Sequence, residues 1–112
     1  MTEQIVILST CASEEEARQI ALLLLERGLA ACVNVIPNCH SYYHWQGKVE
    51  RGSECLLQVK SSRALFAEVN SAIEGAHSYE VPEVIALPIV DGSANYLNWL
   101  GSSLRPERKE ES

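Results

Sequence analysis

One segment of the chain places side chains that can bind metal ions directly in front of an apolar run. "HSYEVPEVIALPIV" begins at His77 and carries a tyrosine and two glutamates around Pro82. A neutral imidazole binds copper, zinc or nickel, and a carboxylate suits harder cations. His77 is therefore the first candidate ligand, with Glu83 as the expected helper. The structural alternative is that His77 caps a helix or binds a turn carbonyl, while Pro82 sets the direction of the chain.

Two other groups of side chains invite a functional interpretation. His40 and His44 share a face of an extended strand, but about 13 Å separates them, so one ion cannot bridge the pair. The aromatic residues Tyr42, Tyr43 and Trp45 lie close together near a predicted hairpin tip. They suit either of two roles, an anchor for another subunit or the lining of a ligand cleft.

Size and charge restrict the class of protein. The 112 residues suit one domain, which we place at 1–104, followed by a polar tail at 105–112 that we expect to be disordered. The net charge of −6 and the absence of a basic cluster before the tail argue against a nucleic-acid partner. The longest apolar stretch is interrupted by charged residues, so no membrane span is expected. With no secretory leader visible, a cytoplasmic location is predicted.

Other motifs that would define a chemistry are missing from the sequence. The four cysteines form no CxxC pair, which argues against a zinc ribbon or a thioredoxin-type site, and each is expected to be a small buried residue. No GxSxG, P-loop, GxGxxG or HExxH motif occurs. We therefore do not expect an enzyme.

Periodicity and turn residues predict seven elements. Strands are expected at 4–10, 29–37 and 84–90, helices at 13–28, 61–75 and 93–104, and a long hairpin at 39–61 with its tip at Gln46-Gly47. Ser13 and Glu16 fit a capping box, and Pro37 implies a bulge or an edge position. The order β-α-β-β-α-β-α predicts an α+β, ferredoxin-like antiparallel sheet with an additional C-terminal helix.

The strands are apolar on both faces, which is unusual for an antiparallel sheet with one face in water. In "VIALPIV" nearly every residue is apolar, so we expect a buried strand. A domain of this size has too few helices to cover both faces. We expect another copy of the sheet to cover the second face, so the pattern predicts a homo-oligomer.

Four ordered motifs identify a resemblance to a known family. "LAACVNVIP", "SYYHWQGKVE", "HSYEVPEVIALPI" and "YLNWL" resemble the CutA family of divalent-cation tolerance proteins, and the match extends from the first strand to about Leu104. The resemblance implies a homotrimer of ferredoxin-like subunits that is similar in assembly to PII signalling proteins. It also implies a role in tolerance of copper or other divalent metals.

The same resemblance implies a set of metal-associated positions, which this chain matches only in part. The family's cysteine near the end of the first strand corresponds to Ser9, and its histidine pair corresponds to Ala76 and His77. Cys11 lies two residues beyond Ser9, on the same side of an extended chain, and is a candidate third ligand. We therefore expect weak binding of Cu or Zn, because one histidine and one carboxylate make a small ligand set.

Two functions remain open from the sequence. The first is a metal-binding protein of divalent-cation tolerance that uses His77, Glu83 and Cys11. The second is a PII-like trimer that binds a small anionic metabolite between subunits. The expected partners are other copies of the chain and divalent metal ions, with neither nucleic acid nor membrane.

Overall fold

The computed structural model describes residues 2–106 and contains four strands, three α-helices and one short 3-10 helix. In chain order these are β1 (Gln4–Cys11), α1 (Glu14–Glu26), β2 (Cys32–Trp45), β3 (Lys48–Ser62), η1 (Arg63–Leu65), α2 (Phe66–Ala76), β4 (Ile85–Pro88) and α3 (Ala94–Ser102). Most of the predicted tail, residues 107–112, lies outside the described residues. Arg105 is described, and it contacts Glu68 and the backbone of Gly28.

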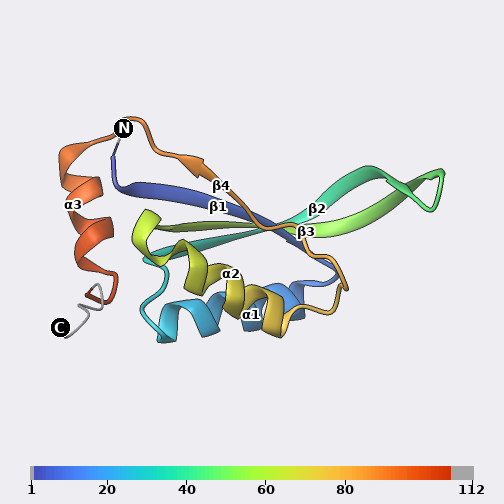
Figure 1. Ribbon diagram of the computed structural model, residues 1–112, viewed down its shortest axis with the longest axis horizontal. Helices are drawn as coiled ribbons and strands as arrows, with labels where there is room; N and C mark the ends of the chain where they lie inside the picture. The colour runs from blue at the N-terminus through green and yellow to red at the C-terminus, as the bar shows by residue number, and fades with distance from the viewer. Residues whose placement is uncertain (1, 107–112) are drawn as a thin grey trace.

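The four strands form one antiparallel sheet in the order β2-β3-β1-β4. Figure 1 shows α1 and α2 side by side against one face of this sheet, with α3 at one end of the strands. The predicted α+β, ferredoxin-like fold with a C-terminal helix is therefore confirmed. The order places the end of β1 beside the start of α1, which is where the candidate site forms.

The main core lies between the sheet and the two covering helices. Alternate residues of β1 and β3 point toward the helices and are buried, as expected for strands with a period of two. The helices contribute apolar residues at helical spacing. The buried core includes Ile5, Ile7, Cys11, Ala17, Ile20, Leu24, Leu57, Val59, Val69 and Ile73.

The opposite side of the sheet, here called the open face, is also apolar. Val6 pairs with Leu87, Leu8 with Ile85, and Ile36 with Leu56 on this face. Between β1 and β3 the pairs also bring in the polar residues Lys60, Gln58 and Thr10. The aliphatic residues of the open face are Val6, Leu8, Ile36, Leu56, Ile85 and Leu87. In Figure 1, α1 and α2 lie against the other side, and α3 lies at one end of the strands. The expectation of apolar side chains on both faces is confirmed, and the homotrimer inferred from it stays a prediction.

The prediction that 84–90 forms a buried strand was wrong in two respects. The strand is shorter, Ile85–Pro88, and all four of its residues are exposed in the single chain. The physical reason is its position: β4 pairs only with β1, so it is an edge strand whose other edge is free. Its apolar residues indicate contact with something beyond the single chain.

The hairpin of β2 and β3 extends as an arm beyond the helices (Figure 1). Its two-residue turn has positive φ at Gln46 (50°) and Gly47 (79°), as a type I′ turn requires. A bulge interrupts the pairing between Ile36 and Cys39, where Asn38 has φ 61°. The predicted hairpin tip and the bulge at Pro37 are both confirmed. The bulge separates the arm from the part of β2 that packs on the body.

Candidate metal site and adjoining cavity

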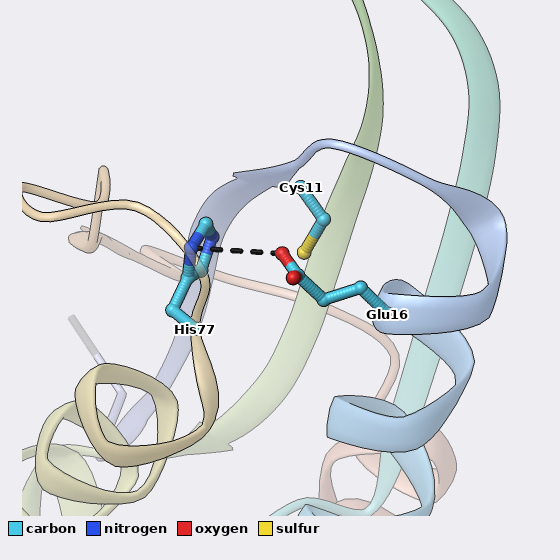
Figure 2. A group of neighbouring side chains, drawn as sticks. All are labelled: Cys11, Glu16 and His77. Atoms are coloured by element: carbon cyan, nitrogen blue, oxygen red, sulfur yellow. Dashed lines mark ion pairs between the residues drawn. The ribbon is translucent and has the colours of Figure 1, made fainter.

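Three potential metal ligands from three different elements meet at one end of the core. Cys11 is the last residue of β1, Glu16 lies in the first turn of α1, and His77 follows the last residue of α2. One donor atom from each residue lies within 4.8 Å of the other two. Figure 2 shows the three side chains pointing toward one another. A thiol, a carboxylate and an imidazole together form a mixed donor set of the kind that zinc and copper accept.

The start of α1 positions Glu16 at this site. Ser13 is the N-cap, and its Oγ accepts a hydrogen bond from the Glu16 backbone N–H at 3.2 Å. The other half of the predicted capping box was wrong, because the Glu16 side chain does not turn back to the helix start. It points to His77 instead (Figure 2). The Ser13 cap thus begins the helix, while the Glu16 side chain points to Cys11 and His77.

His77 is held by hydrogen bonds at both ring nitrogens. Nε2 lies 2.6 Å from the carbonyl oxygen of Thr10, which can only accept, so Nε2 carries a proton. Nδ1 accepts a hydrogen bond from the Tyr79 backbone N–H at 3.0 Å, which requires the Nδ1 lone pair. The His77 side chain is 0% exposed. These bonds specify the neutral tautomer and join the end of α2 to the end of β1, so the structural role suggested by the sequence is present.

Glu16 has a carboxylate oxygen without a partner. Its Oε1 is buried and has no hydrogen bond, although the side chain as a whole is 15% exposed. Oε1 lies 3.6 Å from Nδ1 of His77, drawn as a dashed line in Figure 2, and this contact is an ion pair only when the imidazole is protonated. Because the Tyr79 bond uses the Nδ1 lone pair, we regard the ring as neutral. A buried carboxylate oxygen facing a neutral ring is costly, and a cation would remove that cost.

Cys11 contributes a thiol rather than a thiolate in the metal-free chain. Burial, and to a lesser extent the nearby charge of Glu16, raise the pKa of Cys11 to about 12. A metal ion binds the thiolate, so it must displace the proton of the thiol. The three donors are therefore of chemical types that bind a divalent cation. To bind one, His77 has to give up its hydrogen bond from the Tyr79 N–H, and Cys11 has to give up its proton.

A cavity of about 490 Å³ lies beside this cluster. It is formed by the arm, the end of β1 and the segment 79–83. The register of Thr10 and Glu54 places it on the same side of the sheet as the open face. Its lining residues are Thr10, Ser41, Tyr43, Trp45, Glu54, Tyr79, Glu80, Val81 and Glu83. The Tyr79 hydroxyl donates to Glu54 Oε2 at 2.8 Å, and burial together with this bond raises the pKa of Tyr79. Tyr79 and Thr10 thus contact both the cluster and the cavity.

The structure places the predicted site residues in two neighbouring groups. His77 and Cys11 come together, but the carboxylate beside them is that of Glu16, while Glu83 lines the cavity. Tyr43 and Trp45 line the same cavity, and Tyr42, on the other face of the strand, is not among the lining residues. Sequence reasoning missed Glu16 because its capping role already explained it. The available signal was its place in the first turn of the helix that follows Cys11.

The sequence and fold match one family over nearly the whole chain. The family model described as "CutA1 divalent ion tolerance protein" matches residues 5–103. This chain belongs to the CutA1 family. A relative from Thermus thermophilus, "Divalent-cation tolerance protein CutA", is 47% identical over 95 residues, which cover 85% of this chain and 92% of that protein. The family is defined by divalent-ion tolerance and not by a catalysed reaction.

Solved CutA structures confirm the fold. The Thermus thermophilus structure named "Divalent cation tolerance protein (Cut A1)" superposes with a TM-score of 0.89 at 44% identity, covering 91% of this chain and 99% of that one. The "Periplasmic divalent cation tolerance protein CutA" of Archaeoglobus fulgidus gives a TM-score of 0.88 at 39% identity, covering 91% and 99%. The CutA family resemblance drawn from four motifs is therefore confirmed.

CutA relatives differ in length and in the compartment that their names state. The Arabidopsis thaliana "Protein CutA, chloroplastic" is 43% identical over 101 residues, covering 90% of this chain and 56% of that protein. This chain thus spans about half of some CutA relatives and nearly all of others. Names that specify chloroplast or periplasm mean that family membership does not decide the predicted cytoplasmic location. Within residues 2–106, no helix is long and apolar enough to span a membrane.

Proposed function

We propose that this CutA protein binds a divalent copper- or zinc-type ion through Cys11, Glu16 and His77 as part of divalent-cation tolerance. The observation that carries the proposal is the buried Glu16 Oε1, which lacks a hydrogen-bond partner and lies beside a thiol and an imidazole. Such an unpaired oxygen is expected where a cation completes the site. A bound cation would neutralise the carboxylate and favour the thiolate of Cys11.

The same geometry predicts weak binding. Nδ1 of His77 already accepts from the Tyr79 amide, so coordination at Nδ1 breaks that hydrogen bond. The raised pKa of Cys11 means that binding also releases the thiol proton. Both costs reduce the affinity relative to a site whose ligands are free and deprotonated. This agrees with the small ligand set expected from the sequence.

The test is calorimetric titration of the metal-free protein with Zn(II), which is redox-inactive, followed by Cu(II). Glu16→Gln keeps the shape of the side chain and should reduce the affinity at least about tenfold, since it removes the charged ligand. Glu14→Gln, in the same helical turn but exposed, is the matched control and should bind as the wild type does. If Glu16→Gln and His77→Ala both give the wild-type isotherm, the cluster is not the metal site.

A second candidate function is binding of a small organic ligand, as a PII-like assembly would do between subunits. The observation in its favour is the cavity beside the arm, whose volume lies within the range of small-molecule sites. Its three glutamates do not suit the anionic metabolite expected from the sequence. A screen of small metabolites by thermal shift, with Tyr43→Leu as the cavity variant, tests this function.

A further inference from the structure

We propose that the cavity binds a small organic cation with an amidinium, guanidinium or substituted ammonium group. The inference deepens the second candidate function, small-ligand binding, and is independent of the metal site. It rests on how the cavity combines carboxylates with aromatic side chains.

One wall is aromatic and belongs to the arm. Tyr43 and Trp45 alternate with outward-facing residues of β2, so both point to the cavity side. On β3, Gly52 has no side chain, and a Cβ placed there would lie 3.6 Å from the Tyr43 ring. The Tyr43 ring therefore lies across the neighbouring strand. Aromatic faces attract cations through their quadrupole, most strongly for tryptophan.

The other walls are acidic. Glu54 projects from β3, while Glu80 and Glu83 come from the segment between α2 and β4. The Tyr79 hydroxyl holds Glu54 in place through the 2.8 Å hydrogen bond. Among residues 2–106 of the single chain, no lysine, arginine or histidine lines this cavity. Carboxylates without basic partners favour a cation and repel an anion.

The combination of aromatic and acidic side chains in the lining determines which kind of cation the cavity can bind. A hydrated metal ion gains little from tyrosine and tryptophan rings, and hard cations prefer a shell of oxygen ligands. An organic cation presents a flat or methylated apolar surface to the rings and N–H donors to the carboxylates. Aromatic and acidic groups together are the usual means of recognising such cations. The chemical class is therefore an organic cation and not a bare ion or a phosphate ester.

The experiment compares three probes that share one ring and differ in charge: benzamidinium, benzamide and benzoate. The protein is the full chain carrying Trp99→Phe, so that Trp45 is the sole tryptophan and reports directly from the cavity. Binding is followed by calorimetry and by Trp45 emission. Benzamidinium should bind at least about tenfold more tightly than benzamide, because cation–π and carboxylate contacts are added. Benzoate should not bind at the same millimolar concentrations.

Variants in the same background locate the site. Glu80→Gln combined with Glu83→Gln preserves side-chain shape and should abolish the preference for benzamidinium over benzamide. Glu74→Gln, on the exposed surface of α2, removes one charge outside the cavity and should leave that preference intact. Tyr43→Leu keeps an apolar wall but removes a π face, and should weaken benzamidinium binding severalfold. Thermal midpoints check that each variant is folded.

Three outcomes of this experiment would contradict the cation proposal. Tighter binding of benzoate than of benzamidinium at the cavity would overturn the cation proposal while leaving small-ligand binding in place. If none of the three probes binds, the cation proposal fails, while the second candidate function is decided by the separate metabolite screen. Benzamidinium binding that is unchanged by both the double glutamine variant and Tyr43→Leu places the probe elsewhere and also overturns the proposal.

Discussion

The candidate metal site is locally unfavourable in the metal-free chain. A buried carboxylate oxygen of Glu16 lacks a partner and faces the ring of His77, while Cys11 is kept neutral by burial. A domain that only needed a packed core would place apolar or hydrogen-bonded groups here. Groups left unsatisfied in an otherwise consistent fold are expected at functional positions. The unfavourable arrangement therefore makes predictions about stability as well as binding.

Glu16→Gln should stabilise the metal-free protein relative to Glu14→Gln. Both changes remove one negative charge from the first turn of α1, where such charges interact favourably with the helix dipole. Only Glu16→Gln also removes a buried charge with an unpaired oxygen. We expect it to be more stable than Glu14→Gln by about 1 kcal/mol. Urea denaturation in the presence of a chelator measures the difference, and equal stabilities would mean that Glu16 is adequately solvated.

Cys11→Ser should reduce the loss of stability at alkaline pH. The unfolded thiol titrates near 9.0, whereas burial first, then Glu16, raises the pKa of folded Cys11 to about 12. Between these values the unfolded state binds fewer protons than the folded state, so stability falls as pH rises, by about 1.4 kcal/mol per pH unit for this thiol. Below pH 9 the thiol has no such effect. Cys55, whose pKa is also raised by burial, adds a separate contribution.

The measurement compares denaturation at pH 8 and pH 10 under reducing conditions. The difference between the two pH values should be smaller in Cys11→Ser than in the wild type by about 1.4 kcal/mol. Cys32→Ser, at a half-buried position of β2, controls for loss of a thiol elsewhere. A Cys11→Ser protein that loses as much stability as the wild type would contradict a buried, neutral Cys11.

At the residue scale, the sequence predicted two of the three residues of the cluster, His77 and Cys11, because their chemistry is distinctive. It missed Glu16, which already had an explanation as a capping residue. His77 was proposed because imidazole is a common metal ligand, and Cys11 followed from its position near the end of β1. Glu16 was assigned to a capping box, because Ser-x-x-Glu before an apolar run has that local meaning. Only the structure shows that the Glu16 side chain points to His77 and not to the start of the helix. The metal-ligand role predicted for Glu83 stays a prediction.

At the element scale, the segment between α2 and β4 connects the candidate metal site to the cavity. His77 binds the end of β1 through Thr10, and two residues later Tyr79 donates its hydroxyl to Glu54 of β3. The His77 and Tyr79 rings also contact each other, with centroids 4.7 Å apart. These contacts fix a segment that has no regular secondary structure.

Tyr79→Phe should therefore loosen this segment. The substitution removes the hydrogen bond to Glu54, which is worth about 1 kcal/mol when partly exposed. It should lower the free energy of unfolding by that amount and increase amide hydrogen exchange in 77–83. Tyr96→Phe, on the exposed side of α3, is the control and should change neither quantity. Unchanged exchange in Tyr79→Phe would show that the His77 contacts alone hold the segment.

The elements themselves were predictable where one local cause determines them. Gln46-Gly47 specified the hairpin turn, Pro37 marked the bulge, and Ser93 begins α3 by accepting from the Tyr96 N–H. The predicted burial of β4 was wrong for the single chain, because an apolar run indicates that a strand is covered but not which part of the chain, or which other molecule, covers it. In the single chain β4 is an exposed edge strand. Its apolar residues therefore predict contacts with another molecule.

At the scale of the whole molecule, the open face explains this discrepancy. Aliphatic side chains from all four strands lie on this face, with polar residues among them at the β1–β3 pairing, and neither α1 nor α2 covers them. Within residues 2–106, no strand pairs with the outer edge of β4. An exposed apolar surface of this kind is typical of an interface. We therefore retain the homotrimer as a prediction, with the number three taken from the family resemblance and the covered face taken from the structure.

Leu87→Glu should disrupt this assembly, whereas Leu22→Glu should not. The two leucines have nearly equal exposure in the single chain, 47% and 45%, but Leu87 lies on the open face and Leu22 on the outer side of α1. Burying a new carboxylate in an interface costs several kcal/mol, which is enough to shift a subunit equilibrium strongly. Light scattering after size exclusion should give about three times the chain mass for the wild type and Leu22→Glu, and a smaller mass for Leu87→Glu. A wild-type protein that elutes as single chains at micromolar concentration, or a Leu87→Glu variant that keeps the wild-type mass, would remove the open face as the interface.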